Sequence, residues 1–548
     1  MTLRFNSPLC IVALAALTVI PTVGRAQQPL LNAPALNSGA AINHGDLAQA
    51  LEQGSQLEQQ KRWAEAVLHY EDALKANPER PELKQRLTMV KAHYDVARRY
   101  NDGSYTKAIH TLTEVEALQI YEDVLLKVSA HYVTAPKWQD LVRQGTTNLG
   151  AALTEPVFAS SNRLNLTAEQ HAQLQRDIRF WTDRQPIDDR RAAKDLVEAI
   201  ARTIKHRYSI APQAIILEYA SGAAAALDEY SSFLTDSQMD EIFAQIEGNF
   251  VGLGVELKTE PAGLLVVNVI SGGPAQQGGV RAGDRIVQVD EKSSDQVSPD
   301  QLADLLRGTE GSLVSVTLRN PTGELRTLKL ARRRVEVPSV EDVRMIDDTG
   351  VGYFKLTSFQ KTTSRDVDAA LWSLHKQGMR SLIMDLRGNP GGLLTAAVDV
   401  ADKFVKDGLI VETRGRSNRE NASHWGKTEN TWGMPLVVLI DHDSASASEI
   451  LAGAIHDHHR GTVVGEKSYG KGSVQGIFPL AVNHTGIRLT TAQWFTPNGT
   501  AISKKGIDPD IVVRSVAKPV PGQPVAAGDD AILRAGLQAA TNLTTASK

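Results

Sequence analysis

A serine between an apolar run and a helical stretch is the first feature of this chain that could do chemistry. Residues 435–440 have the pattern of a buried strand, and the run 444–448, Ser-Ala-Ser-Ala-Ser, follows them before a helix. A helix start offers unpaired amides and the positive end of the helix dipole. Ser446 could expose its hydroxyl there, while the Ala447 amide faces a developing oxyanion. The segment predicts a nucleophile, although Ser444 or Ser446 could instead only cap the helix.

A serine nucleophile needs a base, and histidine is the usual one. His456 would lie ten residues after Ser446 on the same helix, roughly 15 Å away, which is too far for a hydrogen bond. Lys471, between two glycines, follows the next strand, and adjacent parallel strands would bring it beside Ser446. A lysine acts as a base only when it is neutral, so burial must lower its pKa. Gln475 could accept a hydrogen bond from the amine and orient it.

A glycine-rich turn supplies a third element. The segment 385–393, Asp-Leu-Arg-Gly-Asn-Pro-Gly-Gly-Leu, ends one strand and starts a helix. Such turns present backbone amides to anions, so Gly391 or Gly392 could donate to an oxyanion. The alternative is a tight strand–helix connection without a chemical role. No nucleotide-binding loop is predicted, because Gly470-Lys471-Gly472 lacks the rest of that motif.

Together these segments resemble the carboxy-terminal processing peptidases, which are serine proteases with a Ser/Lys dyad. In that family the lysine follows the serine by 25 residues and a glutamine follows the lysine by four, as positions 446, 471 and 475 do here. The resemblance covers about residues 230–515. It implies that Ser446 is the nucleophile, Lys471 the general base and Gln475 its positioning residue, with no metal or cofactor. The oxyanion donors that it implies are the amides of Ala447, Gly391 and Gly392.

The family also carries a PDZ domain before its catalytic core. Residues 250–255, Phe-Val-Gly-Leu-Gly-Val, resemble its carboxylate-binding loop, and Gly272-Gly273-Pro274 and Gly283-Asp284 follow as in that domain. Turn amides could hold a terminal carboxylate, and a strand from Val255 could add a substrate tail beside a helix over 300–306. The resemblance implies that this domain gates the proteolytic site. The substrate-binding residues that it implies are Gly252, Leu253, Gly254 and Val255.

The elements that must position these residues fall into separate segments. After residue 350 strands alternate with helices, which predicts an α/β layered core. Residues 250–335 read as strands with one short helix. Apolar residues at 63, 66, 67, 70, 73 and 74 form a helical stripe that resembles half of a tetratricopeptide repeat, an irregular helical hairpin being the alternative.

The predicted fold is therefore multidomain α+β, with a helical N-terminal region, a PDZ-like β module and an α/β protease core of ββα-type layers. The boundaries that we predict are a signal peptide over 1–26, tetratricopeptide-like helices over 42–130, further helices with an insertion near 155–220 over 131–248, a PDZ domain over 249–335, a protease core over 336–515 and a tail over 516–548.

Composition limits the class of protein and its location. The chain has 548 residues, 42% of them hydrophobic, with a formal net charge of −4, which excludes general disorder and makes nucleic acid a poor partner. The apolar run Leu9–Ile20 and the small residues ending at Ala26 are typical of a secretory signal peptide. Cys10, the only cysteine, lies inside it, so we expect an exported, periplasmic chain without thiol chemistry.

The function predicted from these features is an exported serine endopeptidase that cleaves proteins near their C-termini. Its partners would be protein substrates with free C-terminal tails, an adaptor on the helical N-terminal region and a second copy of the chain, without nucleic acid. Two alternatives stay open: a non-catalytic peptide-binding scaffold, and a hydrolase of small esters or amides. The scaffold does not explain why serine, lysine and glutamine keep their spacing, and the small-molecule hydrolase does not explain the PDZ-like module.

Overall fold

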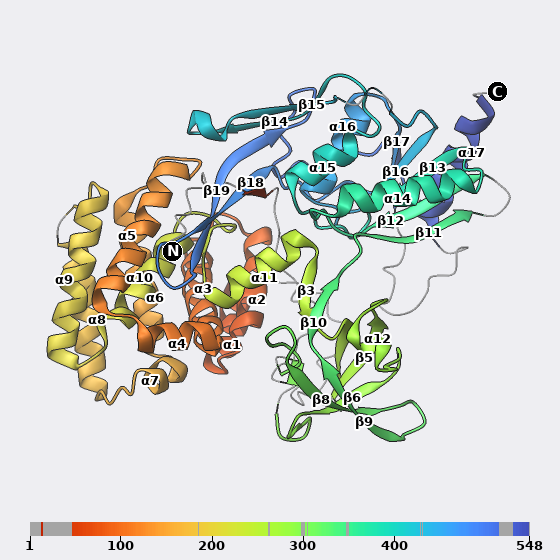
Figure 1. Cartoon of the computed structure of the whole chain (residues 1–548). Helices are drawn as coiled ribbons and strands as arrows, with labels where there is room; N and C mark the ends of the chain where they lie inside the picture. Colours follow the sequence, from red (N-terminus) through yellow and green to blue (C-terminus); the bar gives the residue numbers. More distant parts are fainter. Residues whose placement is uncertain are drawn as a thin grey trace, which may run out of the picture.

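The computed structural model describes residues 12–14, 47–184, 186–260, 263–297, 302–303, 305–346, 350–427, 429, 431–514 and 530–546. The predicted signal peptide lies outside the described residues except for strand β1 (Val12–Leu14), and so does the first half of the predicted tail. Figure 1 shows a helical region, a small β module on a narrow stalk, and a core of sheets and helices. Among the described helices, none is both long enough and apolar enough to cross a membrane.

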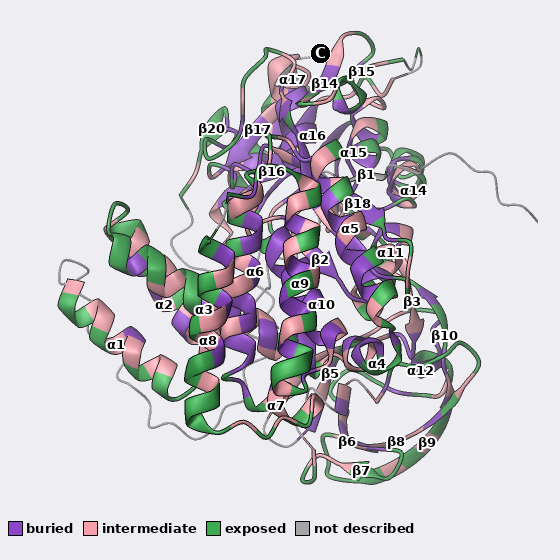
Figure 2. Cartoon of the chain, turned by 90° about the vertical axis from the view of Figure 1, so that its left-hand side faces the viewer, coloured by how far each residue is buried: buried purple, intermediate pink, exposed green. Residues whose placement is uncertain are grey.

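The helical region comprises the first ten helices, and its centre is α10. This helix is buried along almost its whole length against α5, α6 and α9 (Figure 2). Segment 155–220, predicted to be an insertion relative to the family, packs within this helical core. The ten helices are α1 (Leu47–Gln59), α2 (Trp63–Ala76), α3 (Pro81–Asn101), α4 (Gly103–Thr111), α5 (Glu114–His131), α6 (Trp138–Ala152), α7 (Pro156–Ser161), α8 (Ala168–Asp183), α9 (Arg190–Tyr208) and α10 (Pro212–Ala225).

The β module is a sheet in the order β4-β5-β6-β8-β9, with β7 paired to β6 and α12 packed beside it. Its members are β4 (Val255–Glu260), β5 (Gly263–Val269), α12 (Pro274–Gln277), β6 (Arg285–Val289), β7 (Lys292–Ser293), β8 (Leu313–Arg319) and β9 (Leu325–Ala331). An antiparallel pair, β3 (Asn249–Gly252) and β10 (Arg333–Glu336), forms the stalk. The helix predicted over 300–306 lies partly outside the described residues, but 302–303 are helical and Leu302 is buried in the module.

The core contains a six-stranded sheet in the order β11-β12-β13-β16-β17-β20, parallel except for β11. Helices α14 (Thr363–Lys376), α15 (Leu394–Ala401) and α16 (Ala447–Asp457) cover one face, and α17 (Ala531–Ala546) covers the other. The predicted alternation of strands and helices is thus confirmed. The strands are β11 (Val340–Ile346), β12 (Val351–Leu356), β13 (Ser381–Asp385), β16 (Leu436–Ile440), β17 (Thr462–Gly465) and β20 (Ile511–Val512).

A second, antiparallel sheet joins this core to the helical region. It has the order β1-β18-β19-β14-β15, and β2 (Ser232–Leu234) also pairs with β19. Because β2 follows α10, this pairing anchors the helices to the core. The other strands are β14 (Leu409–Gly415), β15 (Ala422–Trp425), β18 (Ser473–Pro479) and β19 (Gly486–Phe495), with α11 (Asp236–Glu247) next to β2 and the short helix η2 (Asn418–Glu420) between β14 and β15.

Candidate active site

The predicted nucleophile lies on a strained turn between β16 and α16. Ser446 has φ +60° and ψ −113°, a conformation that residues other than glycine rarely adopt. Gly391 packs so closely against this turn that an added Cβ would lie 2.8 Å from the Ser446 Cβ. A strained strand-to-helix turn of this kind also carries the nucleophile of other hydrolases. The glycine-rich segment and the serine-rich segment therefore meet at the Ser446 side chain.

Hydrogen bonding distinguishes the three serines of this turn. The Ser444 hydroxyl donates to the Leu386 carbonyl oxygen at 2.9 Å, and the Ser448 hydroxyl donates to the Asn389 carbonyl oxygen at 2.9 Å. The Ser446 Oγ is buried and has no hydrogen-bond partner within the part of the chain that the structure describes. Of the three hydroxyls, only that of Ser446 is thus left available for reaction.

Lys471 is buried in the loop before β18, with 2% of its surface exposed. Burial, and then the positive charge of Arg488, lower the pKa of Lys471 to about 7, against the opposing effect of Glu229, Asp228 and Glu449. Its amine lies 4.1 Å from the centre of the Tyr230 ring and forms no hydrogen bond with any described residue. With a pKa of about 7, the amine is neutral in roughly half of the molecules at pH 7, but it lies against Tyr230 instead of bonding to Ser446.

Gln475 lies on β18, four residues after Lys471. Its Nε2 donates to the hydroxyls of Ser473 at 3.0 Å and Thr490 at 3.3 Å. Its Oε1 is buried without a partner in the described residues, so it is free to accept. The hydrogen bond predicted between Gln475 and the lysine amine is not formed in this conformation, and the role of Gln475 stays a prediction.

Glu449, which sequence reasoning missed, joins the serine turn to the lysine loop. Its carboxylate accepts hydrogen bonds from the amides of Ser446 at 2.7 Å, Gly470 at 2.7 Å and Lys471 at 2.9 Å, and from the Ser468 hydroxyl at 2.6 Å. Burial raises the pKa of Glu449, and the four hydrogen bonds oppose this increase. A glutamate inside the otherwise apolar helix was the signal available in the sequence.

The predicted oxyanion donors differ in their hydrogen bonding. The Gly391 amide donates to the Asn389 side chain at 2.9 Å, so it is occupied in this conformation. The amides of Ala447 and Gly392 donate to no described residue. The Ala445 amide donates to the Asn389 carbonyl oxygen at 3.0 Å and holds the two turns together. This arrangement favours Ala447 and Gly392 over Gly391 as donors.

Known proteins resemble this chain along its second half. The model of peptidase family S41 matches residues 350–513, and a PDZ domain model matches residues 265–320. A carboxy-terminal-processing protease of Bartonella bacilliformis is 37% identical over 322 residues, which cover 57% of this chain and 73% of the relative. The carboxyl-terminal-processing protease of Synechocystis is 35% identical over 297 residues, which cover 53% of this chain and 69% of that protein.

This chain belongs to the carboxy-terminal-processing protease family. It is a serine-type peptidase with an S41 core and a PDZ domain, which confirms the predicted family and enzyme class. A probable CtpA-like serine protease of Staphylococcus haemolyticus is 33% identical, and the match covers 53% of this chain and 58% of that protein. The solved photosystem II D1 C-terminal processing protease is 26% identical, covers 73% of this chain and 94% of its own, and has a TM-score of 0.37.

The PDZ domain of this family member has a loop with unpaired amides and a strand at the edge of its sheet. The amides of Leu253 and Gly254 donate to no described residue, and Gly254 has φ +77°. Val255 pairs with Val269 on β5, and β4 is the edge strand of its sheet. Gly252 instead pairs with Arg333 in the stalk. The loop amides and the outer edge of β4 are thus unpaired among the described residues, although Leu253 and Gly254 are buried, while Gly252 belongs to the connection to the core.

A cluster of charged side chains that the sequence analysis did not predict connects helix α17 to the glycine-rich turn. The Arg387 guanidinium donates to Asp385 at 2.6 Å and to Asp530 at 2.8 Å. Asp530 also accepts from the Leu533 amide and so caps α17. Tyr353 donates to Asp385 at 2.9 Å, and the ion pairs with Arg387 lower the pKa of Asp530 despite its burial. The strand end that leads into the turn with Gly391 and Gly392 is therefore held from the face of the parallel sheet that α17 covers.

Proposed function

We propose that this chain is an exported endopeptidase that cleaves proteins near their C-termini with Ser446 as nucleophile and Lys471 as general base. The observation that carries the proposal is the buried, unpartnered Ser446 hydroxyl on a strained turn, close in the fold to a buried lysine whose pKa is about 7. Ser444 and Ser448 are not proposed as the nucleophile, because their hydroxyls donate hydrogen bonds to backbone carbonyl oxygens.

The reaction requires the lysine amine to leave the Tyr230 ring and turn toward Ser446, where the Gln475 Oε1 can accept one of its hydrogens. The neutral amine takes the hydroxyl proton as Oγ attacks the substrate carbonyl carbon. The amides of Ala447 and Gly392 donate to the resulting oxyanion. When the intermediate collapses, the lysine ammonium returns its proton to the leaving amine and an ester on Ser446 remains. Water, deprotonated by the same lysine, then hydrolyses that ester.

Two strand edges support binding of an extended substrate. The edge of β4 in the PDZ domain can add a tail as a further strand, with the Leu253 and Gly254 amides at its carboxylate. The outer edge of β18 pairs with β1, in which Leu14 lies opposite Gln475. That edge therefore accepts an extended chain beside the proposed site, and in the mature protein we assign it to the substrate.

Export is proposed from the N-terminal sequence, in which an apolar run ends in small residues at Ala26. A periplasmic location, docking of an adaptor on the helical region, tetratricopeptide-like binding by that region and self-association remain expectations from the sequence. The scaffold alternative predicts binding without cleavage, and it leaves the strained Ser446 turn without a purpose.

The test is cleavage of an unfolded protein with an apolar C-terminus, supplied with a free or an amidated terminal carboxylate. We expect truncation near the C-terminus, a higher KM for the amidated form, and no turnover by the Ser446→Ala variant. Binding of the free form without cleavage by the native protein would support the scaffold. Full activity of Lys471→Ala at neutral pH would contradict the dyad.

A further inference from the structure

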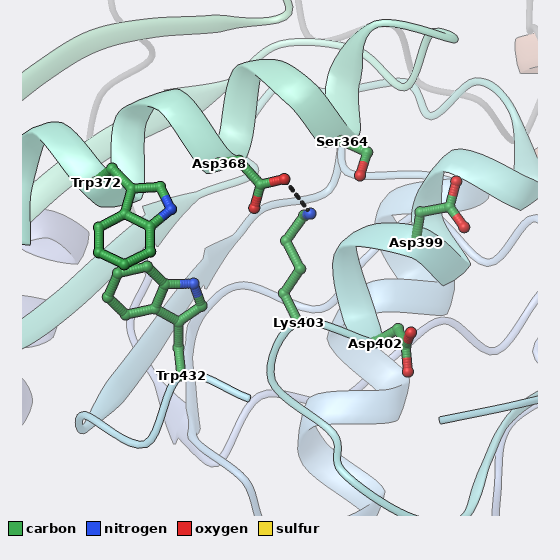
Figure 3. A pocket seen from close by; sticks show the side chains of 7 residues that line it. All are labelled: Ser364, Asp368, Trp372, Asp399, Asp402, Lys403 and Trp432. Carbon is green, nitrogen blue, oxygen red and sulfur yellow. Dashed lines mark hydrogen bonds and ion pairs between the residues drawn. The ribbon is translucent and has the colours of Figure 1, made fainter. Parts of the chain in front are cut away.

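A cavity of about 390 Å³ lies on the protease core, away from the proposed active site. Its walls come from α14, from the end of α15 and the residues after it, and from the segment before β16 (Figure 3). Ser446 follows the carboxyl end of β16, whereas Trp432 precedes its amino end. The Trp432 end of the cavity therefore lies toward the amino ends of the parallel strands. Its lining residues are Ser364, Asp368, Trp372, Asp399, Asp402, Lys403 and Trp432.

One end of this cavity is aromatic. The rings of Trp372 and Trp432 meet edge to face with their centres 5.1 Å apart, and the His375 ring lies within 6 Å of both. Trp372 is 55% exposed. The Trp432 backbone amide donates to the Lys403 carbonyl oxygen at 2.9 Å, which fixes that segment. An exposed, prearranged indole pair offers a large apolar contact at little entropic cost, as in binding hot spots.

The other end of the cavity is acidic. Figure 3 shows Asp399 and Asp402 on the far side of the Lys403–Asp368 ion pair from the two indoles. That pair, 2.7 Å long, neutralises Lys403, so the lining residues carry a formal charge of −2. Asp399 and Asp402 are three positions apart, about one helical turn, and Asp402 also accepts a hydrogen bond from the Lys427 amide at 2.5 Å. Burial raises the pKa of Asp399, while the charges of Lys403 and His424 lower it and that of Asp402 raises it.

We propose that this cavity binds an extended polypeptide segment that carries an apolar side chain followed two residues later by an arginine. In an extended chain such residues face the same side about 7 Å apart. The apolar side chain would pack on Trp372 and Trp432, and the guanidinium would pair with Asp399 and Asp402. Arginine suits this end because its planar fork can donate to two carboxylates at once. The cavity is then a second contact for a basic substrate or partner protein, independent of the PDZ domain.

Calorimetric titration of the full-length Ser446→Ala protein tests this binding without cleavage. The probe is acetyl-Gly-Leu-Gly-Arg-Gly-amide, whose blocked C-terminus prevents carboxylate capture by the PDZ domain. Citrulline in place of arginine keeps the shape and removes the charge, and serine in place of leucine removes the apolar contact. We expect each change to weaken binding at least fivefold. Arginine amide and spermidine supply the charge alone, and we expect them to bind at least fivefold more weakly than the peptide.

Protein variants assign the two ends of the cavity. Asp399→Asn should weaken binding of the arginine peptide at least fivefold but leave binding of the citrulline peptide unchanged. Trp372→Ala should weaken binding of the leucine peptide at least fivefold but leave binding of the serine peptide unchanged. Trp425→Ala, at a tryptophan that is 52% exposed on β15 and outside the cavity, is the matched control and should bind like the parent. Equal affinity for arginine and citrulline peptides, binding unaffected by either cavity variant, or tighter binding of spermidine would overturn the proposal. None of these results depends on whether the chain is a protease.

Discussion

At the scale of single residues, the proposed site combines three buried polar groups that lack their expected partners. Ser446 Oγ and Gln475 Oε1 have no hydrogen-bond partner among the described residues, and the Lys471 amine lies against the Tyr230 ring. Unpaired buried polar atoms and a strained φ lower the folding stability, and such features are found most often at functional sites. The surrounding structure holds these groups in place, chiefly through the four hydrogen bonds to Glu449.

The pH dependence of cleavage should follow Lys471. Only the neutral amine can accept the Ser446 proton, and the pKa of Lys471 is about 7. We therefore expect kcat/KM to rise about tenfold per pH unit below pH 7 and to level off above it. A pH series with a short peptide substrate measures this. A rate that stays constant from pH 5 to 9 would mean that another group, or no group, acts as the base.

The folding stability of the protein should depend on pH because of the same buried lysine. The pKa of Lys471 is about 7 in the folded protein and 10.5 as its ordinary value, so between these pH values the unfolded chain binds one more proton. Lysine burial therefore costs most below pH 7, and stability increases with pH by up to about 1.4 kcal/mol per unit between pH 7 and 10.5. Lys471→Met should remove that slope from the unfolding transition of the protease core, measured by denaturant at pH 7.5, 8.5 and 9.5. An unchanged slope would contradict the lowered pKa.

At the scale of elements, α17 supports the glycine-rich turn through one ion pair. Asp530 caps α17 and accepts from Arg387, which stands two residues before Asn389 in that turn. Asp530→Ala should lower kcat about threefold to tenfold and leave KM within a factor of two, because losing a partly buried charged hydrogen bond costs on the order of 1 kcal/mol. Asp183→Ala, in the exposed pair with Arg143, is the control and should change neither constant. A change in KM alone would place Asp530 in substrate binding instead.

Close helix packing in the N-terminal region depends on small residues. A Cβ at Gly145 on α6 would lie 2.3 Å from the Tyr219 ring on α10, whereas a Cβ at Gly150 would meet nothing within 4 Å. Gly145→Ala should destabilise the helical region by about 1–3 kcal/mol through overpacking. Gly150→Ala on the same helix should be neutral or stabilise it by about 0.5–1 kcal/mol, because alanine favours the helix. Thermal unfolding of the two variants decides this, and equal melting temperatures would contradict the packing.

At the scale of the whole molecule, the features predictable from sequence are those built by neighbouring residues. The parallel order of β13, β16 and β17 brings together the carboxyl ends of three strands, which lead into the glycine-rich turn, the serine turn and the lysine loop. Local patterns therefore sufficed to predict that these segments meet. Contacts between distant segments were not predictable. The pairing of β2 with β19 and the bond from Arg387 to Asp530 join residues far apart in sequence. The side-chain direction of Lys471 and the use of the Gly391 amide by Asn389 also depend on the packed structure.

The PDZ domain and the helical region are joined to the core in different ways. The PDZ domain is attached through the β3–β10 ribbon, while the helical region is anchored to the core by β2 (Figure 1). The PDZ domain is thus joined to the core by one two-stranded ribbon, and its Arg307 also pairs with Glu241 on α11. Capture of a substrate tail at the β4 edge belongs to the proposed function.

The measurement that tests the central claim most directly is cleavage by three single-serine variants of the full chain. An unfolded protein with a free apolar C-terminus serves as substrate, and intact mass spectrometry follows its truncation. Ser446→Ala should give no product at any time. Ser444→Ala and Ser448→Ala should each retain cleavage within about tenfold of the native rate, since each loses one hydrogen bond to a backbone oxygen. Product from Ser446→Ala at the native rate, or abolition by Ser444→Ala with Ser446→Ala active, would contradict the assignment of the nucleophile.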